Sequence, residues 1–76
     1  MSQGYSLRLR DLNRRAPSKL LGVRLGRVCV KHNVPVTVVA QRMGVTRQTV
    51  YNWFAGTTNP QPALTSLVES YIAQFS

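Results

Sequence analysis

Pro35, Gly44 and Gly56 divide the middle of this chain into two short segments, residues 36–43 and residues 45–55. In both segments apolar residues recur at intervals of one, three or four residues, which places them on one face of a helix. A single glycine between two such segments is the usual left-handed end of the first helix. The sequence therefore predicts two short helices, over residues 36–43 and about 47–55, joined by a tight turn, with Thr46 as the N-cap of the second.

A longer helix is predicted before this pair, over residues 17–31. Pro17 suits its first position, where a missing N–H is tolerated. A stripe of residues at helical spacing is expected to face the core: Leu21, Leu25, Val28 and His32. Gly22 and Gly26 stack on one side of this helix and leave room for the close approach of another.

A last helix is predicted over residues 63–75. Its apolar stripe is broad and comprises Leu64, Leu67, Val68, Tyr71, Ile72 and Phe75. Because this stripe covers more of the helix surface than one core contact requires, we expect the helix both to pack on the core and to form a self-association surface. Leu67, Val68 and Ile72 are predicted to face inward, and Tyr71 and Phe75 to meet a second copy in a homodimer.

Residues 1–16 are predicted to form a basic N-terminal arm ahead of a domain at residues 17–76. Leucines alternate with charged residues over residues 7–12, which is compatible with a short strand. The cations of the arm are Arg8, Arg10, Arg14 and Arg15.

The charge of the chain indicates its class of partner. Ten Lys and Arg residues face two acids, Asp11 and Glu69, which gives a net charge of +8 over 76 residues. A one-sign field of this kind attracts polyanions. Nucleic acid is the first candidate, ahead of an anionic membrane surface or an acidic protein.

Several functional classes are disfavoured by what the sequence contains. No apolar run approaches the roughly 18 residues of a membrane span, and two carboxylates cannot supply an acid–base pair or a metal site. Cys29 is expected to be a small buried apolar group, and His32 to interact with a helix end rather than with a metal. We therefore expect no enzyme activity, cofactor, metal, membrane contact or small-molecule substrate, and a reduced, cytoplasmic setting such as a bacterial host cell or nucleoid.

The paired short helices have the pattern of a helix-turn-helix, and the segment from Val39 to Gly56 resembles the phage repressor and Cro family. The resemblance covers about residues 20–62 and rests on the spacing of five positions: Ala40, Gly44, Val45, Val50 and Trp53. It implies an all-α, lambda-repressor-like domain of four helices. We expect its core to contain Leu21, Leu25, Val28, Val39, Ala40, Met43, Val45, Val50, Trp53, Leu67, Val68 and Ile72.

The outer face of the second short helix carries side chains that suit the major groove. Arginine pairs with guanine, and glutamine or asparagine pairs with adenine. The candidates for base readout are Arg47, Gln48, Tyr51 and Asn52. The candidates for phosphate contact are Thr46, Thr49, Thr57, Thr58, Asn59 and Arg42. Trp53 and Phe54 are expected in the core.

The function predicted from these features is sequence-specific binding of double-stranded DNA by a small phage-type transcriptional regulator. One recognition helix reads only a short half-site, so a homodimer is expected. Two alternatives remain: a DNA-coating or architectural protein of low specificity, and a phage module that binds a host regulator or polymerase. A large ratio of specific to nonspecific affinity separates the first prediction from both alternatives.

Overall fold

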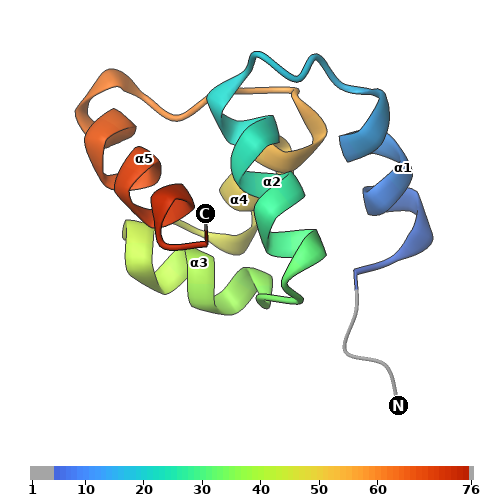
Figure 1. The fold of residues 1–76 in the computed structure, drawn as a ribbon, viewed down its shortest axis with the longest axis horizontal. Coiled ribbons are helices and arrows are strands. Elements are labelled where there is room, and N and C mark those ends of the chain that lie inside the picture. Colours follow the sequence, from blue (N-terminus) through green and yellow to red (C-terminus); the bar gives the residue numbers. More distant parts are fainter. Residues whose placement is uncertain (1–4, 76) are drawn as a thin grey trace.

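A computed structural model describes residues 5–75 of the protein, and over that range the chain is helical with no strand (Figure 1). The elements are α1 (Leu7–Arg15), α2 (Leu21–Lys31), α3 (Val36–Met43), α4 (Arg47–Ala55), the short 3-10 helix η1 (Pro62–Leu64) and α5 (Thr65–Ala73). The predicted all-α class is confirmed, but the described residues contain five α-helices and not the expected four, because residues 7–15 add a helix. Residues 1–4 of the predicted arm lie outside the described range.

The packing of α2 on α4 is the most extensive between helices of the described residues and depends on two glycines of α2. A Cβ atom added to Gly22 would lie 2.8 Å from Cβ of Trp53, and one added to Gly26 would lie 2.9 Å from Cγ of Phe54. Both distances are shorter than real side-chain contacts. The prediction that these glycines admit a neighbouring helix is confirmed, and that neighbour is α4.

Residues 7–15 form a helix and not a strand or an extended arm, which corrects the prediction for this segment. Ser6 caps α1 by accepting the backbone N–H of Leu9 at 3.1 Å. Leu9 and Asn13 lie four residues apart, on one face of the helix, and both are buried. Leu7 is 81% exposed, so the alternation of leucines does not mark the buried face. α1 packs beside both α2 and α4 (Figure 1).

The start of α2 also differs from the prediction. Pro17 lies in a turn and the helix begins at Leu21, so this proline is not its first residue. The cap comes instead from a distant loop, because the side-chain oxygen of Asn59 accepts the backbone N–H of Gly22 at 2.9 Å. A capping residue 37 positions away leaves no local signal in the sequence.

The core agrees with much of the expected set and corrects one helix. Among the predicted residues, the buried ones are Leu25, Val39, Ala40, Met43, Val50, Trp53 and Val68; the partly buried ones are Leu21, Val28, Val45 and Ile72. Leu67 was expected inside but is 45% exposed, whereas Tyr71 was expected outside and is only 5% exposed. The stripe was predicted correctly, but two of its neighbouring members, Leu67 and Tyr71, were assigned to the wrong sides of it.

The aromatic residues at the chain end close the core of the single chain. The Phe75 ring lies 5.4 Å from the Tyr71 ring, edge to face, and 4.8 Å from the His32 ring. Tyr71 is therefore a core residue and not the outward-facing residue that was expected, while Phe75 is half-buried. His32 ends α2, as expected, but its imidazole is exposed and does not face the core as the predicted stripe had it; the ring lies tilted against that of Phe75.

Candidate nucleic-acid interface

α3 and α4 form the two helices and the turn that the sequence predicts. Gly44 ends α3 with φ of 70°, a left-handed conformation that costs other residues free energy. Thr46 caps α4 by accepting the backbone N–H of Thr49 at 3.2 Å. Gly56 ends α4 with φ of 81°. These local devices fix the length of α4 and its angle to α3.

One side of α4 is buried and determines which side chains remain outside. Val50, Trp53 and Phe54 are each at most 3% exposed and pack toward α2 and α3. At 100° per residue, Gln48 and Asn52 lie on the opposite side of the helix. The expectation that Trp53 and Phe54 are core residues is therefore confirmed.

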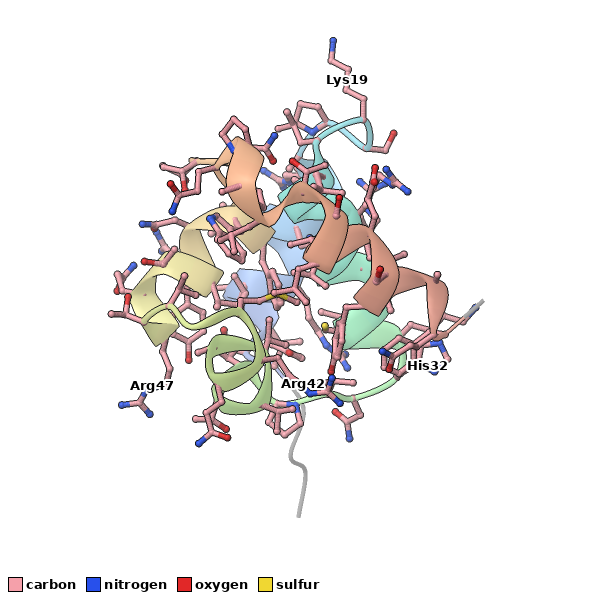
Figure 2. All side chains as sticks on the ribbon, turned by 90° about the vertical axis from the view of Figure 1, so that its left-hand side faces the viewer. Lys19, His32, Arg42 and Arg47 are labelled. Carbon is pink, nitrogen blue, oxygen red and sulfur yellow. The ribbon has the colours of Figure 1, made fainter. Side chains whose placement is uncertain are left out.

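The four candidates for base readout lie together along α4. Arg47 and Gln48 are exposed at its first turn, and Tyr51 is 40% exposed one turn later. Nε2 of Gln48 donates a hydrogen bond to Oδ1 of Asn52 at 3.2 Å. Figure 2 shows Arg47 extending outward at the edge of the molecule, away from Lys19 and His32. The structure thus brings all four side chains to one helix face.

The candidates for phosphate contact are less uniform. The hydroxyls of Thr46 and Thr49 lie 2.9 Å apart at the start of α4, and Thr57 and Thr58 are exposed just beyond its end. The side-chain oxygen of Asn59 is bonded to the first turn of α2.

Arg42 lies apart from this group of candidates. Its guanidinium carbon is 5.4 Å from the centre of the Tyr71 ring. The cation therefore packs on the helix that follows the loop, rather than beside the readout residues of α4.

α1 contributes to this interface in a way that the sequence did not reveal. A groove of ≈350 Å³ runs between α1 and α4, with Ser6, Arg8, Leu9 and Leu12 on one side and Gln48, Tyr51, Asn52, Ala55 and Thr57 on the other. A second groove of ≈240 Å³ places Arg47 and Tyr51 next to Tyr5 and the start of α3. Arg8 is therefore the cation of the predicted arm that lies beside the candidate readout residues.

The position of α1 depends on a buried amide that sequence reasoning missed. Nδ2 of Asn13 donates to the backbone oxygen of Phe54 at 2.7 Å and to that of Val23 at 3.2 Å. These bonds connect α1 to the end of α4 and to α2. The available signal was the four-residue spacing of Leu9 and Asn13, which a strand interpretation concealed.

Arg27 holds the other end of α1. Its guanidinium donates to the backbone oxygens of Ala16 at 3.0 Å, Arg14 at 3.2 Å and Asn13 at 3.4 Å. The last carbonyls of a helix lack partners within the helix and carry partial negative charge, so a cation at this place stabilises the helix end. Arg27 is thus a structural residue.

The titratable groups near the core are shifted by burial. Burial raises the pKa of the Cys29 thiol to about 12, and it also raises the pKa values of Tyr5 and Tyr71. The Tyr5 hydroxyl donates to the backbone oxygen of Val34. Cys29 is fully buried, as expected for a small apolar group.

Two further features bear on the class of site. Over residues 5–75 no group of three or more His, Cys, Asp or Glu side chains is arranged to hold a metal ion. In the same range no helix has the length and apolar character needed to cross a membrane.

Comparison with known proteins gives one match. A family model described as "Helix-turn-helix" matches residues 23–71, which is 49 of the 76 residues and runs from α2 to α5. No curated protein and no solved structure matches the chain.

Proposed function

Because this chain belongs to the helix-turn-helix family of non-enzymatic DNA-binding domains, we propose that it binds double-stranded DNA sequence-specifically as a small phage-type transcriptional regulator. The observation that carries the proposal is the division of α4 into two sides. Val50, Trp53 and Phe54 anchor it in the core, while Arg47 and Gln48 are exposed and the half-buried Asn52 follows one turn after Gln48.

The chemistry of these three side chains suits base edges in the major groove. Arg47 lies at the first turn of α4, the end that enters the groove in helix-turn-helix complexes. A guanidinium matches the two acceptors of guanine, and an amide matches the donor and acceptor of adenine. The bond between Gln48 and Asn52 holds the two amides side by side. Their remaining groups, the oxygen of Gln48 and the nitrogen of Asn52, together offer an acceptor and a donor.

Contacts to the phosphate backbone of the DNA would position α4 in the major groove. We assign these to Thr46 and Thr49 at its start and to Thr57 and Thr58 beyond its end, with Arg8 added from α1. Asn59 and Arg42 contribute less in this proposal, since the oxygen of Asn59 caps α2 and the guanidinium of Arg42 packs on Tyr71.

A homodimer is part of the proposal, because two recognition helices read a longer site than one. Tyr71 and Phe75 pack within the chain, so they no longer support this dimer. Leu67 is the exposed apolar residue on α5 and is our candidate for the contact. The protein would then act on an approximately palindromic site in the DNA of a bacterial cell.

Selection of binding sites from random duplexes tests the proposal. We expect a preferred site, and Arg47→Ala and Gln48→Ala should each lower affinity for it by roughly 1–3 kcal/mol while relaxing base choice there. Lys19→Ala, which removes a cation on the opposite side of the molecule from Arg47 (Figure 2), is the matched control and should preserve base choice. Equal losses of Arg47→Ala and Gln48→Ala on preferred and random duplexes would contradict base readout and favour the architectural alternative.

A further inference from the structure

A third groove, separate from the two beside α4, lies between α1 and α2 and is cationic. It has a volume of ≈500 Å³ and is lined by Arg10, Asn13, Arg14, Arg27, Val30 and Lys31. Four of these six side chains carry positive charge. Val30 is its one apolar side chain, and no aromatic residue lines it.

The positive charge of this groove is poorly compensated within the chain. Asp11 forms ion pairs with Arg14 at 2.6 Å and Arg15 at 3.2 Å. The guanidinium of Arg27 is fixed by three backbone oxygens at the end of α1. Arg10 and Lys31 are exposed and form no ion pair within residues 5–75. Each of the two facing helices therefore presents a cation to the groove.

The groove opens away from the readout face of α4. Arg8 and Arg10 lie about 200° apart around α1, so the groove that contains Arg10 is on the other side of α1 from the groove that contains Arg8. On α2, Gly22 and Gly26 contact α4, and Lys31 projects from the opposite side of that helix. Figure 1 shows α2 lying in front of α4, with α1 beside both.

We propose that the groove between α1 and α2 binds the phosphate backbone of a second DNA duplex, so that one chain bridges two DNA segments. The inference rests on the proposed binding of a first duplex by α4. Guanidinium and ammonium groups are the usual ligands of phosphate oxygens. Because contact with the backbone depends on charge and not on base identity, this second duplex can have any sequence.

The test measures capture of a second duplex. A duplex carrying the preferred site is fixed to beads and saturated with protein, and a labelled duplex of unrelated sequence is added. The variants are Arg10→Gln and Lys31→Gln, separately and together, and Lys19→Gln is the control with the same charge change as Lys31→Gln. Arg27 is left intact because it supports α1.

We expect the wild type and Lys19→Gln to capture the labelled duplex. The double variant should bind the bead duplex within about twofold of the wild type, while the log–log salt slope of capture falls by about 1.8, at about 0.9 for each lost phosphate contact. Arg47→Ala should lower site preference on the beads and leave the dependence of capture on Arg10 and Lys31 unchanged. The experiment therefore distinguishes failure of the proposed base readout by α4 from failure of the proposed second-duplex binding between α1 and α2.

Four results would overturn the proposal. If the wild type captures no second duplex, no bridging surface exists. If the double variant captures as much as the wild type, bridging occurs through a dimer or another surface. If affinity for the bead duplex falls as far as capture does, the groove contacts the first duplex. If polyglutamate at equal charge concentration displaces the labelled duplex as well as unlabelled duplex does, the ligand is an acidic protein.

Discussion

Gly26→Ala tests how tertiary packing changes the expected effect of a helix substitution. Gly26 lies inside α2, where alanine is favoured over glycine by about 1 kcal/mol in an isolated helix. In the folded chain the new Cβ would lie 2.5 Å from Nδ2 of Asn13 and 2.9 Å from Cγ of Phe54. The propensity scale and the packing therefore predict opposite signs.

The magnitude follows from the contacts that must move. The Asn13 amide is held by bonds of 2.7 and 3.2 Å to two backbone oxygens, and losing each costs about 1 kcal/mol. Overpacking against Phe54 adds about 1–3 kcal/mol. After the gain in helix propensity of about 1 kcal/mol, we expect a net loss of about 2–4 kcal/mol. That is a large share of the total for 76 residues, roughly 4–11 kcal/mol at the usual stability per residue.

Urea denaturation of Gly26→Ala, Asn13→Ala and the double variant measures this loss and its cause. In the Asn13→Ala background the 2.5 Å contact is absent, so Gly26→Ala should cost less there, with a coupling free energy of about 1–2 kcal/mol. Gly44→Ala is the control, since its φ is 70° and nothing lies within 4 Å of the added Cβ. It should cost about 1–2 kcal/mol and show no coupling. This account of the packing would be refuted if Gly26→Ala stabilised the protein, or if the losses in unfolding free energy of Gly26→Ala and Asn13→Ala simply added in the double variant.

Three further outcomes are expected. Removal of residues 1–16 should abolish cooperative thermal unfolding, because Leu9 and Asn13 are buried against the domain; a truncated chain that unfolds cooperatively near the wild-type Tm would restore the arm hypothesis. The free energy of unfolding should fall as pH rises from 9 toward about 12, since the Cys29 thiol ionises near 9 in the unfolded chain and near 12 in the folded one. Urea titrations from about pH 8 to about pH 11 should show a shallower fall for Cys29→Ala, and identical slopes would contradict the assignment. Leu67→Glu should shift the proposed dimer to monomer in sedimentation, with little change in stability, because this side chain is 45% exposed; a monomeric wild type, with and without a palindromic site, would remove the dimer.

The helix-turn-helix was readable from the sequence because each of its determinants is local. Gly44 and Gly56 end the helices through their own backbone conformation. Thr46 caps α4 by accepting the backbone N–H of Thr49, only three residues further along. The bounds predicted for α3 and α4 accordingly match the structure. The side chains on the outside of α4 followed from the same short repeat.

The surroundings of that motif depend on contacts between residues far apart in the chain, which spacing does not encode. Residues 7–12 fit a strand or a helix equally well by pattern, and burial of Asn13 against Phe54, 41 positions away, decides for the helix. The stripe on α5 was predicted from its period, but whether Leu67 or Tyr71 faces inward depends on how the whole helix is turned on the core. Local sequence thus determined the helix-turn-helix, and tertiary packing decided where α1 lies and which cations surround the motif.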